Sequence, residues 1–339
     1  MNGEKILRRS VRRKARAACV LAFGLVAACA FVHVGAQEGE GWRGARAGAA
    51  GKDLNTVYFA DTKRGWAAGD GGLVFRTEDG GRTWARQAVG ATDQINDLYF
   101  RDKEDGYLLA GGRILKTGDS GRSWYESRNF RPADFGGGVP ELYSVRFASK
   151  KKGWIVGSVS RRDVVTDSLV LFTDDAGASW RVQLVPSRDE LIHLDFADEK
   201  RGWIVGDKGT ILHTTDGGLN WSRQRTNTSA TLYHVDFTDE DHGWAVGERG
   251  TILRTEDGGA TWTAVASPGV RATLLSVQFV SDEQGWAVGR GGTILRSDDG
   301  GRAWIQQESG TKQNLYALFV NKKNGWAVGG DGMILQYER

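Results

Sequence analysis

Hydrophobic and polar residues alternate in short stretches along most of the chain, and these stretches follow a fixed order. In residues 232–265, the segment Leu232 to Phe237 alternates between apolar and polar positions, which is typical of a strand with one buried face. A charged turn, the apolar run 244–246, a glycine turn and the run 251–254 follow, and 262–265 completes the unit. Four short strands joined by tight turns predict one four-stranded antiparallel sheet.

The same order of segments recurs seven times. Each unit has a glycine–aromatic pair at the start of its second strand: Gly65-Trp66, Gly106-Tyr107, Gly153-Trp154, Gly202-Trp203, Gly243-Trp244, Gly285-Trp286 and Gly325-Trp326. The aromatic residues are 41, 47, 49, 41, 42 and 40 residues apart, which is the length of a propeller blade. The pattern therefore predicts an all-β fold, a seven-bladed β-propeller of four-stranded antiparallel blades, over residues 37–339.

A second motif of the form Ser/Thr-x-Asp-x-Gly-x-x-Trp follows the third strand of every unit but the last. The first copy runs from Thr77 to Trp84, and its aspartate can accept hydrogen bonds from turn amides while glycine supplies a positive φ. Because the motif occurs six times, we expect its aspartates to be structural rather than catalytic. They are Asp79, Asp119, Asp175, Asp216, Asp257 and Asp299.

The seventh unit lacks a fourth strand, because the chain ends at Arg339 soon after the third. Trp42 lies 17 residues before Phe59, just as Trp262 of a complete unit lies 17 residues before Phe279. We therefore expect residues 42–46 to pair with the strand at 333–336. Such pairing would close the ring and remove its exposed edges.

Residues 1–36 differ from the rest and are typical of a secretory leader. Seven basic residues between positions 5 and 16 precede an apolar run from Ala17 to Val34. Three outcomes remain open: cleavage after Ala36, lipidation of Cys29 within a lipobox-like Val26-Ala27-Ala28-Cys29, or retention as a membrane anchor. Each one predicts export to the periplasm or the extracytoplasmic face of a membrane, with membrane contact through the leader or a lipid.

Charge and composition exclude several classes. Residues 37–339 keep 38 of the 45 basic and 41 of the 42 acidic residues, a net charge of −3, so nothing favours nucleic-acid binding. Both cysteines, Cys19 and Cys29, lie in the leader, which leaves no thiol for a disulfide or a metal site in the propeller. We expect neither a cofactor nor a metal.

The first strand of each unit is expected to line the central channel. When the units are aligned on Phe59, Phe100, Phe147, Phe196, Phe237, Phe279 and Phe319, the residues one and three positions earlier share the channel face. His193 and Asp195, with His234 and Asp236 of the next unit, then form a polar cluster. The cluster is either a water-filled channel wall or a metal or acid–base site.

Two further features are candidate binding surfaces. A column before the aspartate motif includes Arg76, Arg254 and Arg296, which would suit acidic protein segments or anionic head groups unless neighbouring acids pair with them. The insertions 125–141 and 158–168 adjoin the third unit, and the first contains Tyr125, Arg128, Phe130 and Arg131. Aromatic and arginine residues are enriched at binding hot spots, although both insertions could equally be solvated loops without a partner.

The repeats in residues 243–262 and 285–304 resemble those of the photosystem II stability/assembly factor family, with the Asp-box of bacterial-neuraminidase-type repeats. The resemblance covers essentially everything after the leader. It implies an exported, non-enzymatic scaffold that binds a protein client, potentially an integral membrane protein, during assembly. The alternative is an Asp-box glycoside hydrolase, sialidase-like, or a carbohydrate-binding propeller. No proline follows an Arg-Ile pair, although sialidases usually carry Arg-Ile-Pro.

Overall fold

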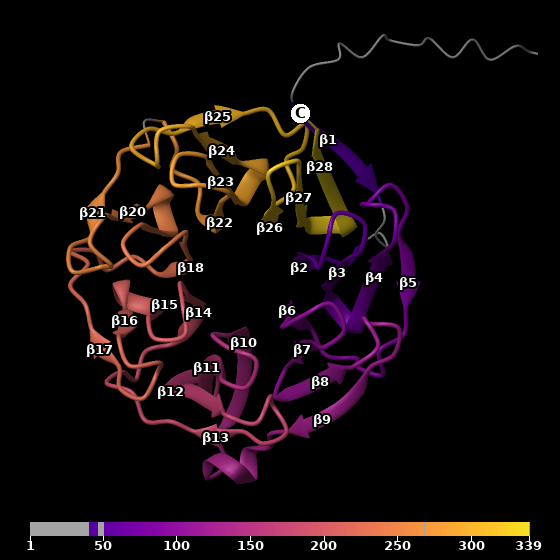
Figure 1. The fold of residues 1–339 in the computed structure, drawn as a ribbon, viewed down its shortest axis with the longest axis vertical. Coiled ribbons are helices and arrows are strands. Elements are labelled where there is room, and N and C mark those ends of the chain that lie inside the picture. Colours follow the sequence, from indigo (N-terminus) through magenta and orange to yellow (C-terminus); the bar gives the residue numbers. More distant parts are fainter. Residues whose placement is uncertain (1–40, 47–50, 268, 339) are drawn as a thin grey trace, which may run out of the picture. The chain divides into compact units, whose positions relative to one another are not determined.

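The computed structural model describes residues 41–46, 51–267 and 269–338 of the chain, and these form seven four-stranded antiparallel sheets. The sheets follow one another around a ring in sequence order (Figure 1). The first strand of each sheet contacts the first strand of the next, and β26 of the last sheet contacts β2 of the first. The predicted seven-bladed propeller is confirmed.

Each blade has four strands, which follow one another from the channel outward. Blade 1 consists of β2 (Leu54–Phe59), β3 (Gly65–Gly69), β4 (Leu73–Thr77) and β5 (Ala85–Gln87), and blade 2 of β6 (Ile95–Phe100), β7 (Gly106–Ala110), β8 (Arg113–Thr117) and β9 (Tyr125–Asn129). Blade 3 consists of β10 (Val139–Phe147), β11 (Gly153–Arg161), β12 (Val164–Thr173) and β13 (Arg181–Val182), and blade 4 of β14 (Leu191–Phe196), β15 (Gly202–Gly206), β16 (Ile211–Thr214) and β17 (Ser222–Arg223). Blade 5 consists of β18 (Leu232–Phe237), β19 (Gly243–Gly247), β20 (Ile252–Thr255) and β21 (Thr263–Ala264), and blade 6 of β22 (Leu274–Phe279), β23 (Gly285–Gly289), β24 (Ile294–Ser297) and β25 (Ile305–Gln307). Blade 7 consists of β26 (Leu315–Val320), β27 (Asn324–Gly329), β28 (Met333–Glu338) and β1 (Gly41–Arg46). Short 3-10 helices are η1 (Asp70–Gly72), η2 (Pro132–Phe135), η3 (Asp207–Gly209), η4 (Glu248–Gly250), η5 (Arg290–Gly292) and η6 (Gly330–Gly332).

The aromatic residue of each glycine–aromatic pair joins neighbouring blades. In blade 4, Trp203 is fully buried and stacks on Phe237 of blade 5 with 3.4 Å between ring centroids. Equivalent stacks at 3.5 to 4.6 Å occur at five other blade interfaces. The glycine before the aromatic residue is needed because a Cβ on Gly202 would lie 2.5 Å from the ring of Phe196. The aromatic residue of the glycine–aromatic pair therefore stabilises the packing of neighbouring blades.

The predicted ring closure is also confirmed. β1 pairs antiparallel with β28 across the whole strand, with Trp42 opposite Tyr337. Trp42 donates a hydrogen bond from Nε1 to Oε1 of Gln307 in blade 6 at 3.0 Å, as Trp262 donates to Gln224 of the preceding blade at 3.0 Å. The N-terminal strand thus fills the slot of the missing fourth strand.

One predicted alignment in the seventh blade is wrong. Val320, not Phe319, pairs with Gly325 and so occupies the position that phenylalanine holds in the other blades. The channel positions one and three residues earlier are consequently Phe319 and Ala317, instead of Leu318 and Tyr316. The neighbouring Phe-Val pair misled the alignment, because either residue can fill an apolar slot.

The two insertions at the third blade are ordered structure. The segment 158–168 lengthens the hairpin of β11 and β12, whose turn places Arg162 and Asp163 at φ of 51° and 61°. Arg161 then donates hydrogen bonds to the carbonyl oxygens of Phe135 and Gly136, at 2.9 and 2.7 Å, and so fixes the other insertion to this hairpin. The two insertions are therefore fixed to each other, and most residues of 131–139 and 161–164 are exposed to solvent.

The leader, its cleavage site and Cys29 lie outside the described residues. Within the described ranges, no helix is long and apolar enough to cross a membrane.

Candidate functional site: the central channel

A bulge at the same place in every first strand decides which side chains face the channel. In β2, Leu54 pairs with Gly69 and Thr56 with Ala68, so Asn55 is an extra residue, and each of the other six first strands has the same shift. A bulge turns two consecutive side chains towards one face. The channel therefore has three rows of residues rather than the two that simple alternation predicts.

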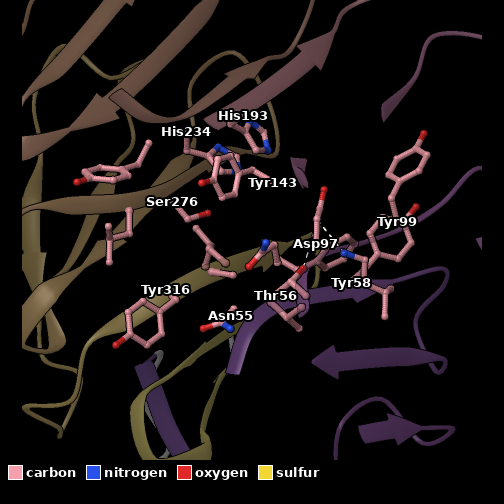
Figure 2. A pocket seen from close by; sticks show the side chains of 18 of the residues that line it. Asn55, Thr56, Tyr58, Asp97, Tyr99, Tyr143, His193, His234, Ser276 and Tyr316 are labelled. Atoms are coloured by element: carbon pink, nitrogen blue, oxygen red, sulfur yellow. Dashed lines mark hydrogen bonds between the residues drawn. The ribbon is translucent and has the colours of Figure 1, made fainter. Parts of the chain in front are cut away.

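The three rows follow one another along the first strands. The outermost row, at the bulge near the start of each strand, was not predicted from the sequence, and it is rich in aromatic and aliphatic residues. It consists of Asn55, Asn96, Tyr143, Ile192, Tyr233, Leu275 and Tyr316. The middle row consists of Thr56, Asp97, Ser144, His193, His234, Ser276 and Ala317, and the innermost row of Tyr58, Tyr99, Arg146, Asp195, Asp236, Gln278 and Phe319. With the exception of Ser144, these side chains line a cavity of about 810 Å³ (Figure 2).

In blades 4 to 6, a side chain of the innermost row binds the backbone of the next blade. Asp195 accepts a hydrogen bond at Oδ2 from the backbone N–H of Phe237 at 2.9 Å, and Asp236 accepts one from Phe279 at 2.8 Å. In the following blade, Oε1 of Gln278 accepts the N–H of Val320 at 2.8 Å. Since an uncharged amide serves equally well in this position, the tie between blades does not require a carboxylate.

Arg146 is the positive charge within this cavity. Its guanidinium donates to Oδ2 of Asp97 at 2.7 Å and to Nε2 of His193 at 2.9 Å, and it lies 5.3 Å from the ring centroid of Tyr99. Burial disfavours the charge, but Asp97 and Asp195 outweigh it and raise the pKa of Arg146. Because arginine only donates, its contact fixes Nε2 of His193 as an acceptor.

The two histidines are held in their neutral forms. Their rings stack with centroids 3.7 Å apart, and Figure 2 shows them side by side on the channel wall. Burial, together with Arg146, lowers the pKa of His234 to about 3; burial, His234 and Arg146 lower that of His193. Neither imidazole therefore contributes positive charge to the channel at neutral pH.

Asp195 and Asp236 are shifted in the opposite direction. Burial raises the pKa of Asp195, and burial together with repulsion from Asp195 raises the pKa of Asp236 well above its ordinary value. The structure thus brings the four predicted residues His193, Asp195, His234 and Asp236 together on one side of the cavity. Burial therefore favours the protonated form of both carboxyl groups more than water does.

The three arginines of the predicted basic column do not form an open patch. Each lies opposite the buried tryptophan of its own blade and pairs with an acid two residues along the chain: Arg76 with Glu78, Arg254 with Glu256 and Arg296 with Asp298. Arg254 also donates to the carbonyl oxygen of Gly300 in the next blade at 2.5 Å. Their side chains are only 15%, 11% and 17% exposed, so little of each is available to a partner.

The four predicted residues of the first insertion separate into different environments. Phe130 is buried between blades 2 and 3 and packs against Phe135, so it is not available to a partner. Arg128 is exposed and lies 4.9 Å from the ring centroid of Phe130, and Arg131 is exposed at the start of η2. Tyr125 on β9 is 58% exposed.

An exposed apolar patch on the outer edge of blades 3 and 4 escaped the sequence analysis. Leu184 is 93% exposed, Leu219 65% and Val182 57%. Gln183 joins the two blades here by donating to the carbonyl oxygen of Leu219 at 3.2 Å. Val182 lies in the fourth strand of blade 3 and Leu219 at a variable position of an Asp-box, so the repeat pattern did not distinguish them.

The Asp-box aspartates are occupied by their own turns. Asp79 accepts hydrogen bonds from the Thr77 hydroxyl at 2.8 Å and from the Thr83 N–H and hydroxyl at 2.9 and 2.6 Å. These bonds, those from Thr83 first, lower the pKa of Asp79 to about 2. The other five aspartates make the same bonds to the Ser/Thr hydroxyl and to the turn amide four residues along.

One surface group of the described residues has the donor atoms of a metal site. The ligand atoms of Asp239, His242 and Asp282 lie within 4.8 Å of one another. Asp239 already accepts the N–H groups of Asp241 and His242, both at 2.7 Å, as Asp61 does in the equivalent turn of blade 1. The group is therefore explained as a turn and its neighbour.

Comparisons with known proteins support the repeat assignment. The sequence model of the family described as photosynthesis system II assembly factor YCF48 matches residues 172–229, 219–273 and 265–338. None of the curated protein sequences matches the chain significantly.

Solved structures share the fold at low sequence identity. YCF48 bound to a D1 peptide is 20% identical with a TM-score of 0.72, over 90% of this chain and 97% of that one. YCF48 from Cyanidioschyzon merolae is 20% identical with a TM-score of 0.70, over 88% and 98%. The GH74 xyloglucanase from Xanthomonas campestris is 15% identical with a TM-score of 0.63, over 87% of this chain and 53% of that one, so enzymes use the fold too.

The closed ring of Asp-box blades defines the chain as a seven-bladed propeller of the BNR-repeat type. Within that class it is a propeller like the photosystem II assembly factors of the YCF48 family.

Proposed function

We propose that this protein is an exported, non-enzymatic scaffold that binds a protein client, and that the client is a membrane protein during its assembly. The observation that carries the proposal is the likeness, over 90% of this chain, to a YCF48 propeller that is bound to a D1 peptide. Fold alone does not determine function, so the repeat family adds the necessary support. The basic, then apolar, pattern of residues 1–36 supports export and attachment to a membrane.

The exposed apolar and aromatic residues supply surfaces for such a client. On the outer surface, the side chains of Leu184, Leu219 and Tyr125 are 93%, 65% and 58% exposed. In the channel, Tyr143, Tyr233 and Tyr316 line the mouth. Tyrosine provides large contact area at a small entropic cost. Tyr143, Tyr233 and Tyr316 lie on β10, β18 and β26, so the channel surface is preorganised for binding.

A glycoside hydrolase is the second candidate, because one specific observation favours it. A carboxyl group with a raised pKa is what a general acid requires, and Asp236 has one beside Asp195. Against this reading, both carboxylates hold the next blade by the same bond that Gln278 makes. Turnover of aryl-glycosides that is lost in Asp236→Asn would favour the hydrolase.

The proposal is tested by cross-linking in intact cells, followed by affinity isolation and mass spectrometry. Co-isolation of integral membrane proteins or their assembly intermediates is the expected result. Recovery of glycans or cell-wall fragments without a protein partner would contradict it. An outer-edge variant, Leu184→Ser, provides a contact test, and Ile305→Ser, which is also exposed but lies in blade 6, serves as the control.

A further inference from the structure

The channel holds more acidic groups than its own basic groups can balance. Asp97, Asp195 and Asp236 line the cavity together with Arg146. Asp97 forms the direct ion pair with Arg146 at 2.7 Å. Asp195 and Asp236 instead accept hydrogen bonds at Oδ2 from backbone N–H groups. A backbone N–H compensates only part of a buried negative charge.

The neighbouring histidines do not correct this imbalance. Burial and Arg146 keep His234 neutral, and His193 already accepts a bond from Arg146. Among the described residues, Nδ1 of His234 is a buried polar atom without a hydrogen-bond partner. The polar wall of the channel is therefore incomplete on the side of blades 4 and 5.

The chain itself demonstrates what this environment stabilises. The guanidinium of Arg146 lies between the carboxylate of Asp97 and the ring of Tyr99. Carboxylates and tyrosine faces together are a recognised setting for organic cations. The cavity repeats these ingredients, since Tyr143 and Tyr233 line it together with the histidines and the two carboxylates.

The approach to the cavity is also acidic. Asp53 and Asp70 line its mouth from blade 1. Tyr143 donates to Oε1 of Glu190 at 2.6 Å, and Tyr316 donates to Oδ2 of Asp53 at 2.9 Å, so the tyrosines at the rim are held in place by acids. A mouth lined with one sign of charge attracts ligands of the other sign.

We propose that the channel binds an organic cation, a guanidinium or a primary ammonium group, which enters past Tyr143 and Tyr233 and pairs with Asp195 and Asp236. The cavity of about 810 Å³ accommodates the end of a long basic side chain or a small free amine. The site does not depend on the proposed client, but a client would supply such a group as a lysine or arginine side chain.

Binding should be coupled to loss of a proton. The titratable groups that line the cavity are Asp53, Tyr58, Asp70, Asp97, Tyr99, Tyr143, Arg146, His193, Asp195, Tyr233, His234, Asp236 and Tyr316. Because burial and Asp195 raise the pKa of Asp236, a cation that pairs with this carboxylate lowers that pKa again and promotes loss of the proton. The affinity for the cation should therefore rise with pH.

Isothermal titration calorimetry of the full protein with agmatine tests the proposal, and the uncharged N-butylurea is the control ligand. We expect saturable agmatine binding, no N-butylurea binding, and proton release seen as a different heat in buffers with different ionisation enthalpies. Asp195→Asn and Asp236→Asn should each weaken binding at least about tenfold. Both variants should fold, because an amide already fills this slot at Gln278.

The exposed Glu308→Gln removes the same charge outside the channel and should leave binding unchanged. A blocked Gly-Gly-Arg-Gly-Gly peptide distinguishes the sources: binding as tight as agmatine indicates a client side chain, and binding of agmatine alone indicates a free amine. Absence of agmatine binding, or equal binding by wild type and both channel variants, would overturn the proposal. Client capture in cells could succeed in either case, so the two proposals fail separately.

Discussion

Replacing Trp42 with alanine should loosen the ring at its closure. β1 is the only strand of the seventh blade that comes from the N-terminal side of the propeller, and it pairs with β28 over six residues. Trp42 is 8% exposed, and its ring lies 5.2 Å from that of Tyr337. Tyr337 in turn packs at 5.4 Å against Trp286 of blade 6, where the other blades use a stacked phenylalanine.

The size of the effect follows from the buried area. A tryptophan side chain buries roughly 150–250 Å², which corresponds to about 4–6 kcal/mol as an upper limit. Large-to-alanine substitutions in cores cost about 3–5 kcal/mol. Loss of the hydrogen bond to Gln307 adds to this, since that amide is only partly exposed. We therefore expect Trp42→Ala to lower the free energy of unfolding by about 3–5 kcal/mol.

Urea unfolding followed by far-UV circular dichroism measures the change from the shift in midpoint. Trp304→Ala is the matched control, because Trp304 occupies the same slot in blade 6 and is also 8% exposed. Ile305→Ala, 70% exposed, should change the free energy of unfolding by less than about 0.5 kcal/mol. A loss below about 1 kcal/mol for Trp42→Ala beside a full loss for Trp304→Ala would refute the closure argument.

Three further changes test the repeat and the channel. Gly81→Ala should lower the melting temperature more than Gly90→Ala, because both have positive φ, 85° and 71°, but only the first would place a Cβ 2.5 Å from Nε1 of Trp326; equal shifts would contradict this. Asp79→Ala should be less stable than wild type at pH 6 and should approach it as the pH falls through about 2, because the depressed pKa means that the stabilising carboxylate is lost there; a pH-independent difference would argue otherwise. Asp236 should stabilise the fold less as the pH rises above about 4, the unfolded pKa of an aspartate, because folding favours its protonated form, so the stability of wild type should fall relative to that of Asp236→Asn in denaturation curves at several pH values; a constant difference would contradict this.

The sequence was sufficient for the blades and for their closure. Each glycine–aromatic pair requires a close approach between chains, and each Asp-box requires a positive φ. Only a few residue types satisfy these local requirements. Because Trp42 lies at the spacing of an Asp-box tryptophan, even the pairing of the two ends of the propeller could be predicted from one residue.

The channel could be predicted only in part. Alternation correctly grouped His193 with Asp195, but the bulges that turn Tyr143 and Tyr233 towards the cavity leave no mark in a pattern of period two. The contacts of Arg254 could not be predicted from the sequence either. Its partners, Glu256 and the carbonyl oxygen of Gly300, come together only when neighbouring blades pack. Contacts between blades depend on the ring, and the repeat describes one blade at a time.

Site-specific photo-cross-linking in living cells tests the central claim, that this propeller binds a protein client, most directly. A photoreactive amino acid would replace Tyr233 at the channel mouth, Leu184 on the outer edge, or Ile305 as the remote control. We predict a discrete protein adduct from Tyr233 or Leu184 and none from Ile305. Absence of an adduct from both sites, with the protein folded and present at normal levels, would contradict the account.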